Sequence, residues 1–501
     1  MEKITAWNCP SHGPVCCDAS PDFASDDCEA IDPELPLSTE ASTRNFPRLL
    51  NVSHAVAYHE PSTALKIPKD LFTSPPEKGA PILQEYIDGL PADERYGVLA
   101  PLVRKHWKWF CRAAPYLKFP EPKPIGEGRT VNIGIRSHML TSGGTERGTA
   151  QLANHFAKKL NCHATVFLDR SAMDRIDYPL DPNVEIVPVQ DPINWALAVR
   201  EHPQDLFVHL SYWKAANFQN ILLLKLLGVR ALAQERGGPN FRIPFRTMAE
   251  KFDHLVPLYS ACDGMSCLSR DELLQWEKKG VTNSVYLPNS PTFPVEDVTP
   301  APLDSKTILW VGRWDKNQKR PELALRAFAK ILKDVPDARL IMLGTNTGQY
   351  QKCYLQCKKL IDRLGIGHAI DIGGFQKDLV PYYSSGALLL CTSAFEGFHR
   401  GIIEAKTFGL PVVSTAMPYL EPLKGGGCIQ VPQGDADGLA AAAIDLLQND
   451  EKRKKLGAEA RQDVLKNFSS KATFEKYDAF FDAIFKGKEA VHEFCAKDLD
   501  R

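Results

Sequence analysis

Residues 395–415, FEGFHRGIIEAKTFGLPVVST, decide the fold of this chain. The apolar run GALLLCTS at 386–393 is typical of a buried strand, RGIIEAKTFG of a short amphipathic helix that ends at Gly409, and PVVST of a second strand. Strand, loop, helix and strand in this order form the repeating unit of a parallel sheet. Because ligands bind such sheets beyond the carboxyl ends of the strands, the loop before the helix is a candidate binding site.

Two carboxylates belong to this stretch, Glu396 in the loop and Glu404 one turn into the helix. On one continuous helix of about 3.6 residues per turn they would not share a face. Split between loop and helix, they can face one cleft. The free amides at the helix start favour a phosphate, while the carboxylates can accept sugar or ribose hydroxyls. The alternative is a capped surface helix with two solvated acids.

Composition narrows the function classes. The net charge of −1 over 501 residues argues against a general nucleic-acid binder. No apolar run reaches the roughly 18 residues of a membrane span, and the N-terminal sequence has no apolar signal-peptide core. The 13 cysteines are mostly scattered in apolar runs, as at Cys267 and Cys391. This pattern favours reduced thiols and a cytoplasmic location.

Residues 1–125 are expected to be an N-terminal extension, partly disordered, because their first 50 residues are acidic and rich in Pro and Ser. Cys9, His12, Cys16, Cys17 and Cys28 could be taken for a zinc cluster. Their spacing contains no paired CxxC pattern, so we predict no metal site there.

Residues 104–112, RKHWKWFCR, interleave basic and aromatic side chains within a helix-like stretch. Such a segment could lie on an anionic membrane surface, which would place the protein at the periphery of a membrane. Alternatively, the aromatic side chains pack on the body of the protein while the charges face water. The packing interpretation is favoured.

Two alternating strand–helix domains follow, at 126–290 and 291–470, and 471–501 form a terminal helix and tail. Both domains are predicted to be α/β, with doubly wound parallel sheets. Gly143 and Gly144 open a helix in the first domain, where bare backbone can approach a ligand. The dinucleotide-binding motif is GxGxxG followed by an acidic residue about 20 positions later, and this loop does not match it. A nicotinamide cofactor is therefore poorly supported.

Two cations mark the second domain. Arg313 ends the strand TILWVGR and Lys319 precedes the next helix, a placement that suits a diphosphate. They could stabilise a nucleotide diphosphate leaving group without a metal. Asp435 and Asp437 form an Asp-x-Asp triplet, but a helix N-cap explains them better than a metal site. His209 ends a strand of the first domain and is a candidate to line the cleft, although a lone His is more often structural.

Over residues 128–485 the chain resembles retaining glycosyltransferases of family 4, which have the two-domain GT-B fold. VGRWDKNQKRPELALRAF (311–328), the 395–415 stretch and the GGTER loop (143–147) carry the resemblance. It implies that Arg313 and Lys319 hold the donor diphosphate and that Glu404 binds the nucleotide ribose. Gly143 and Gly144 would close over the donor phosphates from the first domain.

The resemblance also assigns the sugar-binding residues. Glu396, with the backbone amides of Gly397 and Phe398, would hold hydroxyls of the donor sugar. His399 stands where the family often has Gly or Pro, which is expected to alter sugar selection. The family often places a His of the first domain near the sugar, and His209 is the candidate for that catalytic role.

The resulting expectation is a metal-independent glycosyltransferase, of the hexosyltransferase type, that moves a sugar from a nucleotide sugar to an acceptor hydroxyl with retained configuration. The nucleotide sugar is a co-substrate, and no cofactor is implied. A glycan, a lipid-linked molecule and a small molecule all remain open as acceptors, so the reaction would serve polysaccharide or glycoconjugate biosynthesis. A nucleotide-sugar epimerase and a non-catalytic nucleotide-sugar binding protein are the alternatives on the same fold.

Overall fold

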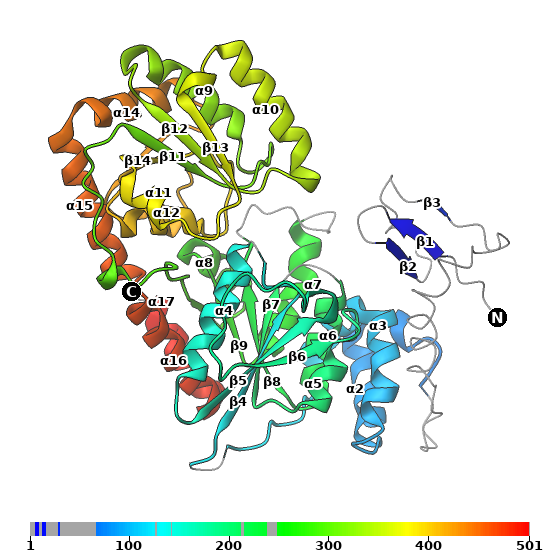
Figure 1. The fold of residues 1–501 in the computed structure, drawn as a ribbon. Helices are drawn as coiled ribbons and strands as arrows, with labels where there is room; N and C mark the ends of the chain where they lie inside the picture. Colours follow the sequence, from blue (N-terminus) through cyan, green and yellow to red (C-terminus); the bar gives the residue numbers. More distant parts are fainter. Residues whose placement is uncertain are drawn as a thin grey trace. The chain divides into compact units, whose positions relative to one another are not determined.

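The computed structural model describes residues 67–125, 128–141, 143–211, 215–237 and 248–499, together with three short N-terminal strands (Figure 1). The chain divides into two compact units, Met1–Ser62 and Thr63–Arg501. In the first unit β1 (Ala6–Cys9), β2 (Gly13–Cys16) and β3 (Glu29–Ala30) form an antiparallel sheet in the order β2-β1-β3. The side chains of the cysteines and the histidine considered as a zinc cluster lie outside the described residues.

The first domain of the larger unit contains a parallel sheet of 7 strands in the order β10-β9-β8-β7-β4-β5-β6. Its strands are β4 (Val131–Ser137), β5 (Cys162–Asp169), β6 (Glu185–Val189), β7 (Leu206–Ser211), β8 (Arg230–Glu235), β9 (Gly264–Cys267) and β10 (Ser284–Tyr286). Its helices are α4 (Gly144–Ala157), α5 (Ala196–Glu201), α6 (Ala215–Leu226), α7 (Met248–Ala261) and α8 (Arg270–Lys278).

Strand β7 shows why this sheet is covered on both faces. Successive strand residues point to opposite faces, and all three of Leu206, Phe207 and Val208 are apolar and buried. Leu206 and Val208 belong to a core that includes residues of α4, whereas Phe207 belongs to a core with residues of α5, α6 and α7. A continuous apolar run therefore gives a strand with helices on both sides.

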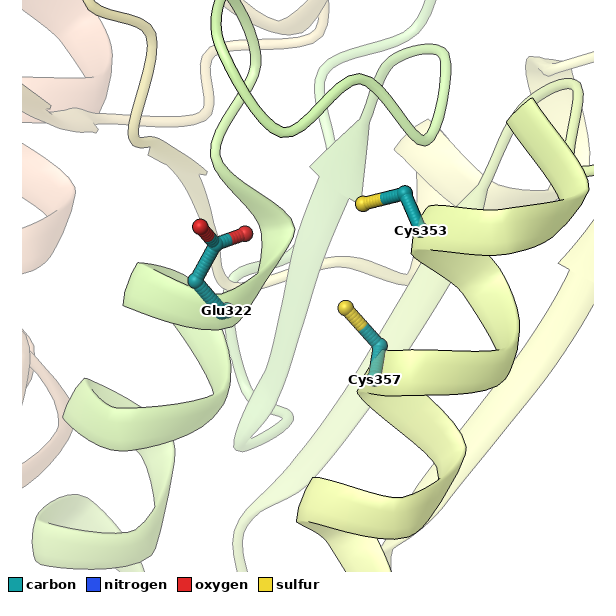
Figure 2. Close-up of side chains that lie close together, drawn as sticks. All are labelled: Glu322, Cys353 and Cys357. Atoms are coloured by element: carbon teal, nitrogen blue, oxygen red, sulfur yellow. The ribbon is translucent and has the colours of Figure 1, made fainter. Parts of the chain in front are cut away.

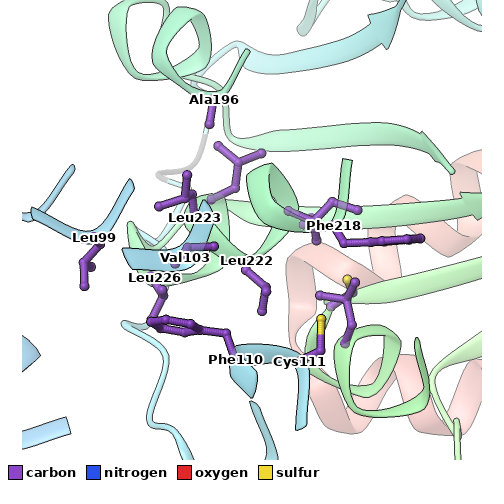
Figure 3. Packing of buried hydrophobic residues seen from close by; sticks show 14 of the residues in the cluster. Leu99, Val103, Phe110, Cys111, Ala196, Phe218, Leu222, Leu223 and Leu226 are labelled. Carbon is purple, nitrogen blue, oxygen red and sulfur yellow. The ribbon is translucent and has the colours of Figure 1, made fainter. Parts of the chain in front are cut away.

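Helices α2 (Pro76–Asp88) and α3 (Arg95–Ala113) precede this domain and add to its core. Figure 3 shows Leu99, Val103 and Phe110 of α3 beside Leu222 and Leu226 of α6. The apolar positions of α3 recur at three- and four-residue intervals, which gives the helix one buried face. Part of the predicted N-terminal extension is thus a helical layer of the first domain.

The aromatic side chains of 104–112 are used inside the protein. Trp109 and Phe110 are buried, and Trp107 stacks on Phe218 with ring centroids 5.7 Å apart. Lys108 faces outward and pairs with Glu250 at 3.1 Å. The packing interpretation of this segment is confirmed. In the described part of the chain, none of the helices combines the length and apolar character needed to span a bilayer.

The second domain has a parallel sheet of 6 strands in the order β13-β12-β11-β14-β15-β16. Its strands are β11 (Thr307–Val311), β12 (Arg339–Leu343), β13 (Ile370–Gly374), β14 (Leu388–Cys391), β15 (Val412–Thr415) and β16 (Cys428–Val431). Its helices are α9 (Pro321–Asp334), α10 (Gln351–Leu364), α11 (Val380–Ser385), α12 (Arg400–Thr407), α13 (Glu421–Lys424), α14 (Ala436–Gln448) and α15 (Asp450–Asn467).

The strand–loop–helix–strand unit predicted from 386–415 is confirmed as β14, α12 and β15, with β14 and β15 paired in parallel. Gly409 follows the helix with φ +72, a backbone conformation that glycine adopts without steric cost. It lets the chain turn sharply into β15.

The last helices return to the first domain. Tyr477, Phe480 and Ile484 of α16 (Ser470–Lys486) are buried in the core that includes α4 and the sheet. The side-chain amide of Gln234 in β8 donates a hydrogen bond to the hydroxyl of Tyr477 at 3.2 Å. Helix α17 (Lys488–Leu499) follows, and its Cys495 belongs to the same core.

Each sheet has one point where the strand order reverses, between β4 and β7 in the first domain and between β11 and β14 in the second. Loops leaving neighbouring strands diverge at such a point and open a crevice. The loops after β4, β11 and β14, with the first turns of the helices that follow β4 and β14, contain the glycines, cations and carboxylates singled out in the sequence.

Candidate functional site

A cavity of about 440 Å³ lies at these strand ends and is lined by residues of both alternating domains. All predicted donor-binding residues and one predicted catalytic residue line it: Gly143, Gly144, Arg313, Lys319, Glu396, Gly397, Phe398, His399 and Glu404. They come from three segments that are far apart in the sequence: the start of α4, the loop between β11 and α9, and the loop after β14 with helix α12. The structure therefore brings these residues together at one cavity. The role of each residue stays a prediction.

The loop between β11 and α9 is held by its own side chains. Asp315 accepts hydrogen bonds from the backbone amides of Asn317 and Gln318 at 2.8 and 2.9 Å. Gln318 in turn accepts a hydrogen bond from Arg313 at 2.9 Å through Oε1. Arg320 adopts φ 50 directly before α9, which is uncommon for a residue with a side chain. This turn sets the direction from which Lys319 enters the cavity.

Lys319 and Glu396 form an ion pair, with Nζ 2.6 Å from Oε1 and side chains 13% and 8% exposed. Burial by itself raises the pKa of Glu396. The charges of Lys319 and His399 and the hydrogen bonds from Lys319 and Ser393 outweigh it, so the net pKa lies below the ordinary value. Glu396 is therefore an ionised acceptor at neutral pH.

Glu404 has three hydrogen-bond donors around it. Arg147 of α4 donates to Oε1 at 2.6 Å, Thr292 donates to the same oxygen, and Tyr383 donates to Oε2 at 3.2 Å. Burial and the charge of Glu404 raise the pKa of Tyr383 well above its ordinary value, so the phenol stays protonated as a donor. Because Arg147 lies in the first domain and Glu404 in the second, this ion pair crosses the cavity.

Arg400, at the start of α12, makes a second link between the domains. Its guanidinium donates to the side chains of Gln151 and Asn289 at 2.7 and 3.0 Å, and to the carbonyl of Ser290 at 2.9 Å. Burial, with the nearby charges of Arg147 and other cations, lowers the pKa of Arg400. A cluster of cations therefore lies beside the cavity, which favours an anionic ligand.

Two helix N-termini reach the cavity without side-chain caps. Helix α4 begins after Gly143, and α12 begins after His399, which adopts φ 54. The first amides of an uncapped helix need acceptors, and the helix dipole favours an anion there. Both helix starts can thus donate backbone hydrogen bonds into the cavity.

Gly397 of the second domain lies against the backbone of the first domain. A Cβ atom at this position would lie 2.5 Å from the carbonyl oxygen of Arg236 and 3.1 Å from that of Gly237. Backbone cannot move aside as the end of a flexible side chain can. The position therefore requires a residue without a side chain.

His209 is not among the residues that line the cavity. Its ring is buried in β7 and stacks on Trp195 with centroids 5.1 Å apart. Burial, with the charges of His138 and Arg136, lowers its pKa to about 3 despite a hydrogen bond with Asn217. The ring is therefore neutral at physiological pH, and its geometry gives no support to the predicted catalytic role.

Asp435 and Asp437 also lie outside the cavity lining. Asp435 is the N-cap of α14, where its carboxylate accepts a hydrogen bond from the amide of Gly438 at 2.8 Å. Asp437 is exposed and pairs with Lys330. The N-cap interpretation is confirmed for Asp435.

Sequence reasoning missed several residues of the cavity. Arg147 is the last residue of the quoted GGTER loop, and its position one turn into a helix could have marked it as pointing toward the loop. Gln318 directly precedes Lys319 in the quoted segment 311–328, and this position could have identified it. Arg236 and Asn289 follow strands β8 and β10 of the first domain, where no motif draws attention to them.

Comparison with known proteins agrees with this arrangement. The family described as Glycosyl transferases group 1 matches residues 305–449, which contain β11 to β16. An N-acetyl-alpha-D-glucosaminyl L-malate synthase of Bacillus anthracis is 27% identical over 178 residues, 35% of this chain and 45% of that protein. The chain thus spans about half the length of the curated relatives that it matches.

Two solved structures share the fold over most of the chain. Sucrose-phosphate synthase from Thermosynechococcus elongatus has a TM-score of 0.60 at 16% identity, covering 71% of this chain and 99% of that one. Anabaena HepE, in complex with UDP and glucose, has a TM-score of 0.58 at 16% identity, covering 70% and 99%. The expected α/β fold is confirmed: residues 305–449 form a Glycosyl transferases group 1 domain, and the chain has the GT-B fold of its glycosyltransferase relatives.

Proposed function

We propose that this protein is a retaining glycosyltransferase that moves a sugar from a nucleoside diphosphate sugar to an acceptor hydroxyl. One observation carries the proposal. The cations Arg313 and Lys319, the buried carboxylates Glu396 and Glu404, and two uncapped helix starts line a single cavity between the domains. This set matches the parts of a nucleotide sugar, since the cations and amides suit the diphosphate and the carboxylates suit the hydroxyls.

Donor binding would replace contacts that the protein makes with itself. The diphosphate pairs with Lys319 in place of Glu396. Glu396 can then accept hydrogen bonds from sugar hydroxyls. The ribose takes one oxygen of Glu404, with Arg147 moving toward the phosphates or away from the cavity. Before a ligand arrives, each buried carboxylate is paired with a cation, and hydroxyl donors of the sugar and the ribose would take the place of that cation on binding.

Leaving-group stabilisation is the main chemical contribution of the chain. When the bond between the sugar and the diphosphate breaks, negative charge grows on the departing phosphate. Arg313, Lys319 and the amides at the start of α12 stand where they can stabilise that charge. These groups supply fixed positive charge without a metal on the diphosphate, so the proposed reaction is metal-independent.

The reaction belongs at the interdomain cavity because both domains must be present to exclude water. Gly397 lies against the backbone of Arg236 and Gly237, and Arg400 reaches across to Asn289. Closure of these surfaces over a bound donor limits hydrolysis and leaves the acceptor hydroxyl as the nucleophile. The acceptor would then bind on the side of the first domain.

The donor class is supported by similarity as well as by charge. HepE, which shares the fold, binds UDP and glucose, and the curated relatives include glycosyltransferases of several substrates. A nucleoside diphosphate hexose fits both observations. The retained configuration follows from the resemblance to family 4 and is tested by the product.

The testing experiment has two stages. Melting temperature is first measured without metal against UDP-, GDP-, ADP- and CDP-sugars, because a ligand of the folded state raises it with concentration. Acceptors are then screened with the stabilising donor, and the anomeric configuration of the product is read by NMR. Donor conversion without an acceptor would favour an epimerase, and donor binding without turnover would favour a binding protein. An inverted product would overturn the retaining assignment.

A further inference from the structure

We propose that Glu322, Cys353 and Cys357 form a binding site for Zn²⁺ that joins helices α9 and α10. Figure 2 shows the two thiols on consecutive turns of α10 and the carboxylate of α9 facing them. One ligand atom from each residue lies within 4.8 Å of the other two. In the described part of the chain, no other three residues of the metal-binding types His, Cys, Asp and Glu come this close together. The site is separate from the proposed reaction and does not depend on it.

The spacing of the cysteines fits bidentate metal binding. Residues four apart on a helix project from the same face one turn apart, so Cys353 and Cys357 present both sulfurs toward α9. Ligand atoms of a tetrahedral zinc site are roughly 3.5–3.8 Å apart, from bond lengths of about 2.0–2.3 Å. The ligand atoms now lie within 4.8 Å of one another, and rotation of the three side chains can bring them to the tetrahedral spacing.

One oxygen of the Glu322 carboxylate lacks a hydrogen-bond partner in the described part of the chain. Its Oε2 atom is buried and makes no hydrogen bond with any described residue. A buried carboxylate oxygen without a partner is costly, and a cation would satisfy it. The residue itself is only half-buried, so a water molecule can reach the site as the fourth ligand.

The donor set selects a thiophilic cation. Both cysteines are buried beneath α9 in the core of the second domain, where a hard cation with several waters would be poorly accommodated. Two thiolates and one carboxylate suit Zn²⁺ far better than Mg²⁺ or Ca²⁺, which prefer oxygen ligands. Binding replaces two S–H protons by Zn–S bonds and releases both protons to solvent.

The location gives the metal a structural consequence. Helix α9 starts just after Lys319 and Arg320, and Glu322 is in its first turn. Tyr354, between the two cysteines, packs edge-on against Trp314 at 5.2 Å, and Trp314 follows Arg313. A metal between α9 and α10 would therefore stiffen both ends of the loop that carries the cavity cations.

Cobalt titration of the reduced, chelator-treated full-length protein tests the site without any donor. We expect one Co²⁺ per chain with a thiolate-to-cobalt charge-transfer band, displacement by Zn²⁺, and release of about two protons. C353S/C357S should abolish the band. E322Q should weaken binding by at least about tenfold, since loss of even an outer-shell partner costs 10- to 100-fold. C162S, which removes a thiol outside the cluster, should leave binding unchanged.

Several results would overturn the proposal. One is no band in the wild-type protein. Another is a band that survives in C353S/C357S, which would assign the metal to the N-terminal cysteines. If the double variant does not fold, as judged by circular dichroism, unchanged cobalt affinity in E322Q overturns the proposal instead.

Discussion

Arg147 of the first domain donates a hydrogen bond to Glu404 of the second at 2.6 Å, so an ion pair spans the cavity between the domains. Their side chains are 12% and 3% exposed, which protects the pair from screening by salt. Lys319 and Glu396 make a similar pair within the second domain. In the proposed reaction the donor competes with both pairs, and this competition determines what substitutions should do.

Glu404→Ala should weaken binding of the nucleotide sugar by about 10- to 100-fold, the loss expected for hydrogen bonds to a charged acceptor. The melting-temperature shift with donor concentration, or calorimetry, gives the dissociation constant. Asp437→Ala is the matched control, because that carboxylate is exposed and lies outside the cavity lining. Equal donor affinity in wild type and Glu404→Ala would remove Glu404 from the proposed site.

Lys319→Ala should lower kcat by about 100- to 1000-fold, the cost of removing one preorganised group from a developing negative charge. Its effect on donor binding should be smaller, because Arg313 and the α12 amides remain. Steady-state kinetics with the best donor and acceptor separate the two effects. Lys330→Ala, which removes an exposed lysine of α9, should keep wild-type kcat; a kcat in Lys319→Ala as high as in this control would contradict the proposed role.

The ion pair between Lys319 and Glu396 predicts that the stability of the fold depends on pH. The pKa of Glu396 lies below its ordinary value of about 4.3, so the pair stabilises the wild-type fold above that pH and loses its contribution as pH falls through the lowered pKa. In Lys319→Met the charge that lowers the pKa of Glu396 most is removed, so burial of Glu396 raises that pKa. The variant's penalty should therefore be largest near pH 7 and shrink toward about pH 4.

Urea unfolding of both proteins across this range measures the difference in free energy of unfolding. Lys330→Met is the control, because its partner Asp437 is 82% exposed and contributes little at any pH. A difference between wild type and Lys319→Met that stays constant from pH 7 to about 4 would show that Glu396 does not depend on Lys319 for its charge.

Much of the fold could be predicted because its signals are local. The run 386–393, the helix of α12 and Gly409 each follow from residue type and spacing, and their order requires parallel pairing. The same logic predicts Arg313, Lys319 and Glu396 in loops beyond strand ends and Glu404 in the helix that follows, and all four line one cavity. Local patterns of this kind fix which edge of a sheet a residue occupies.

Contacts between distant segments could not be predicted in this way. His209 lies within β7, the strand beside the point where the order reverses, and its ring packs in the core against Trp195. No sequence pattern predicts a partner for Arg400, because its partners Gln151 and Asn289 belong to the other domain. Such pairings depend on how the two domains pack, for which one sequence contains no periodic signal.

Turnover should not require Mg²⁺. The Asp-x-Asp residues are engaged in capping α14 and in a surface ion pair, so activity should survive EDTA and the Asp435→Asn/Asp437→Asn variant should keep wild-type kcat. Product formation is measured in EDTA and again after Mg²⁺ or Zn²⁺ is added. Activity that is lost in EDTA and restored by Mg²⁺ but not by Zn²⁺ would contradict the metal-independent mechanism.

Gly397→Ala tests whether the cavity must close for reaction. The new Cβ would lie 2.5 Å from the carbonyl oxygen of Arg236, so the two domains would have to separate slightly. Overpacking costs about 1–3 kcal/mol, which corresponds to roughly a 5- to 160-fold loss of kcat if closure precedes transfer. Gly97→Ala is the control, because a Cβ there meets nothing within 4 Å and the residue lies inside α3, where Ala should raise stability. A Gly397→Ala protein with wild-type kcat and an unchanged ratio of transfer to donor hydrolysis would show that close contact at this point is not needed.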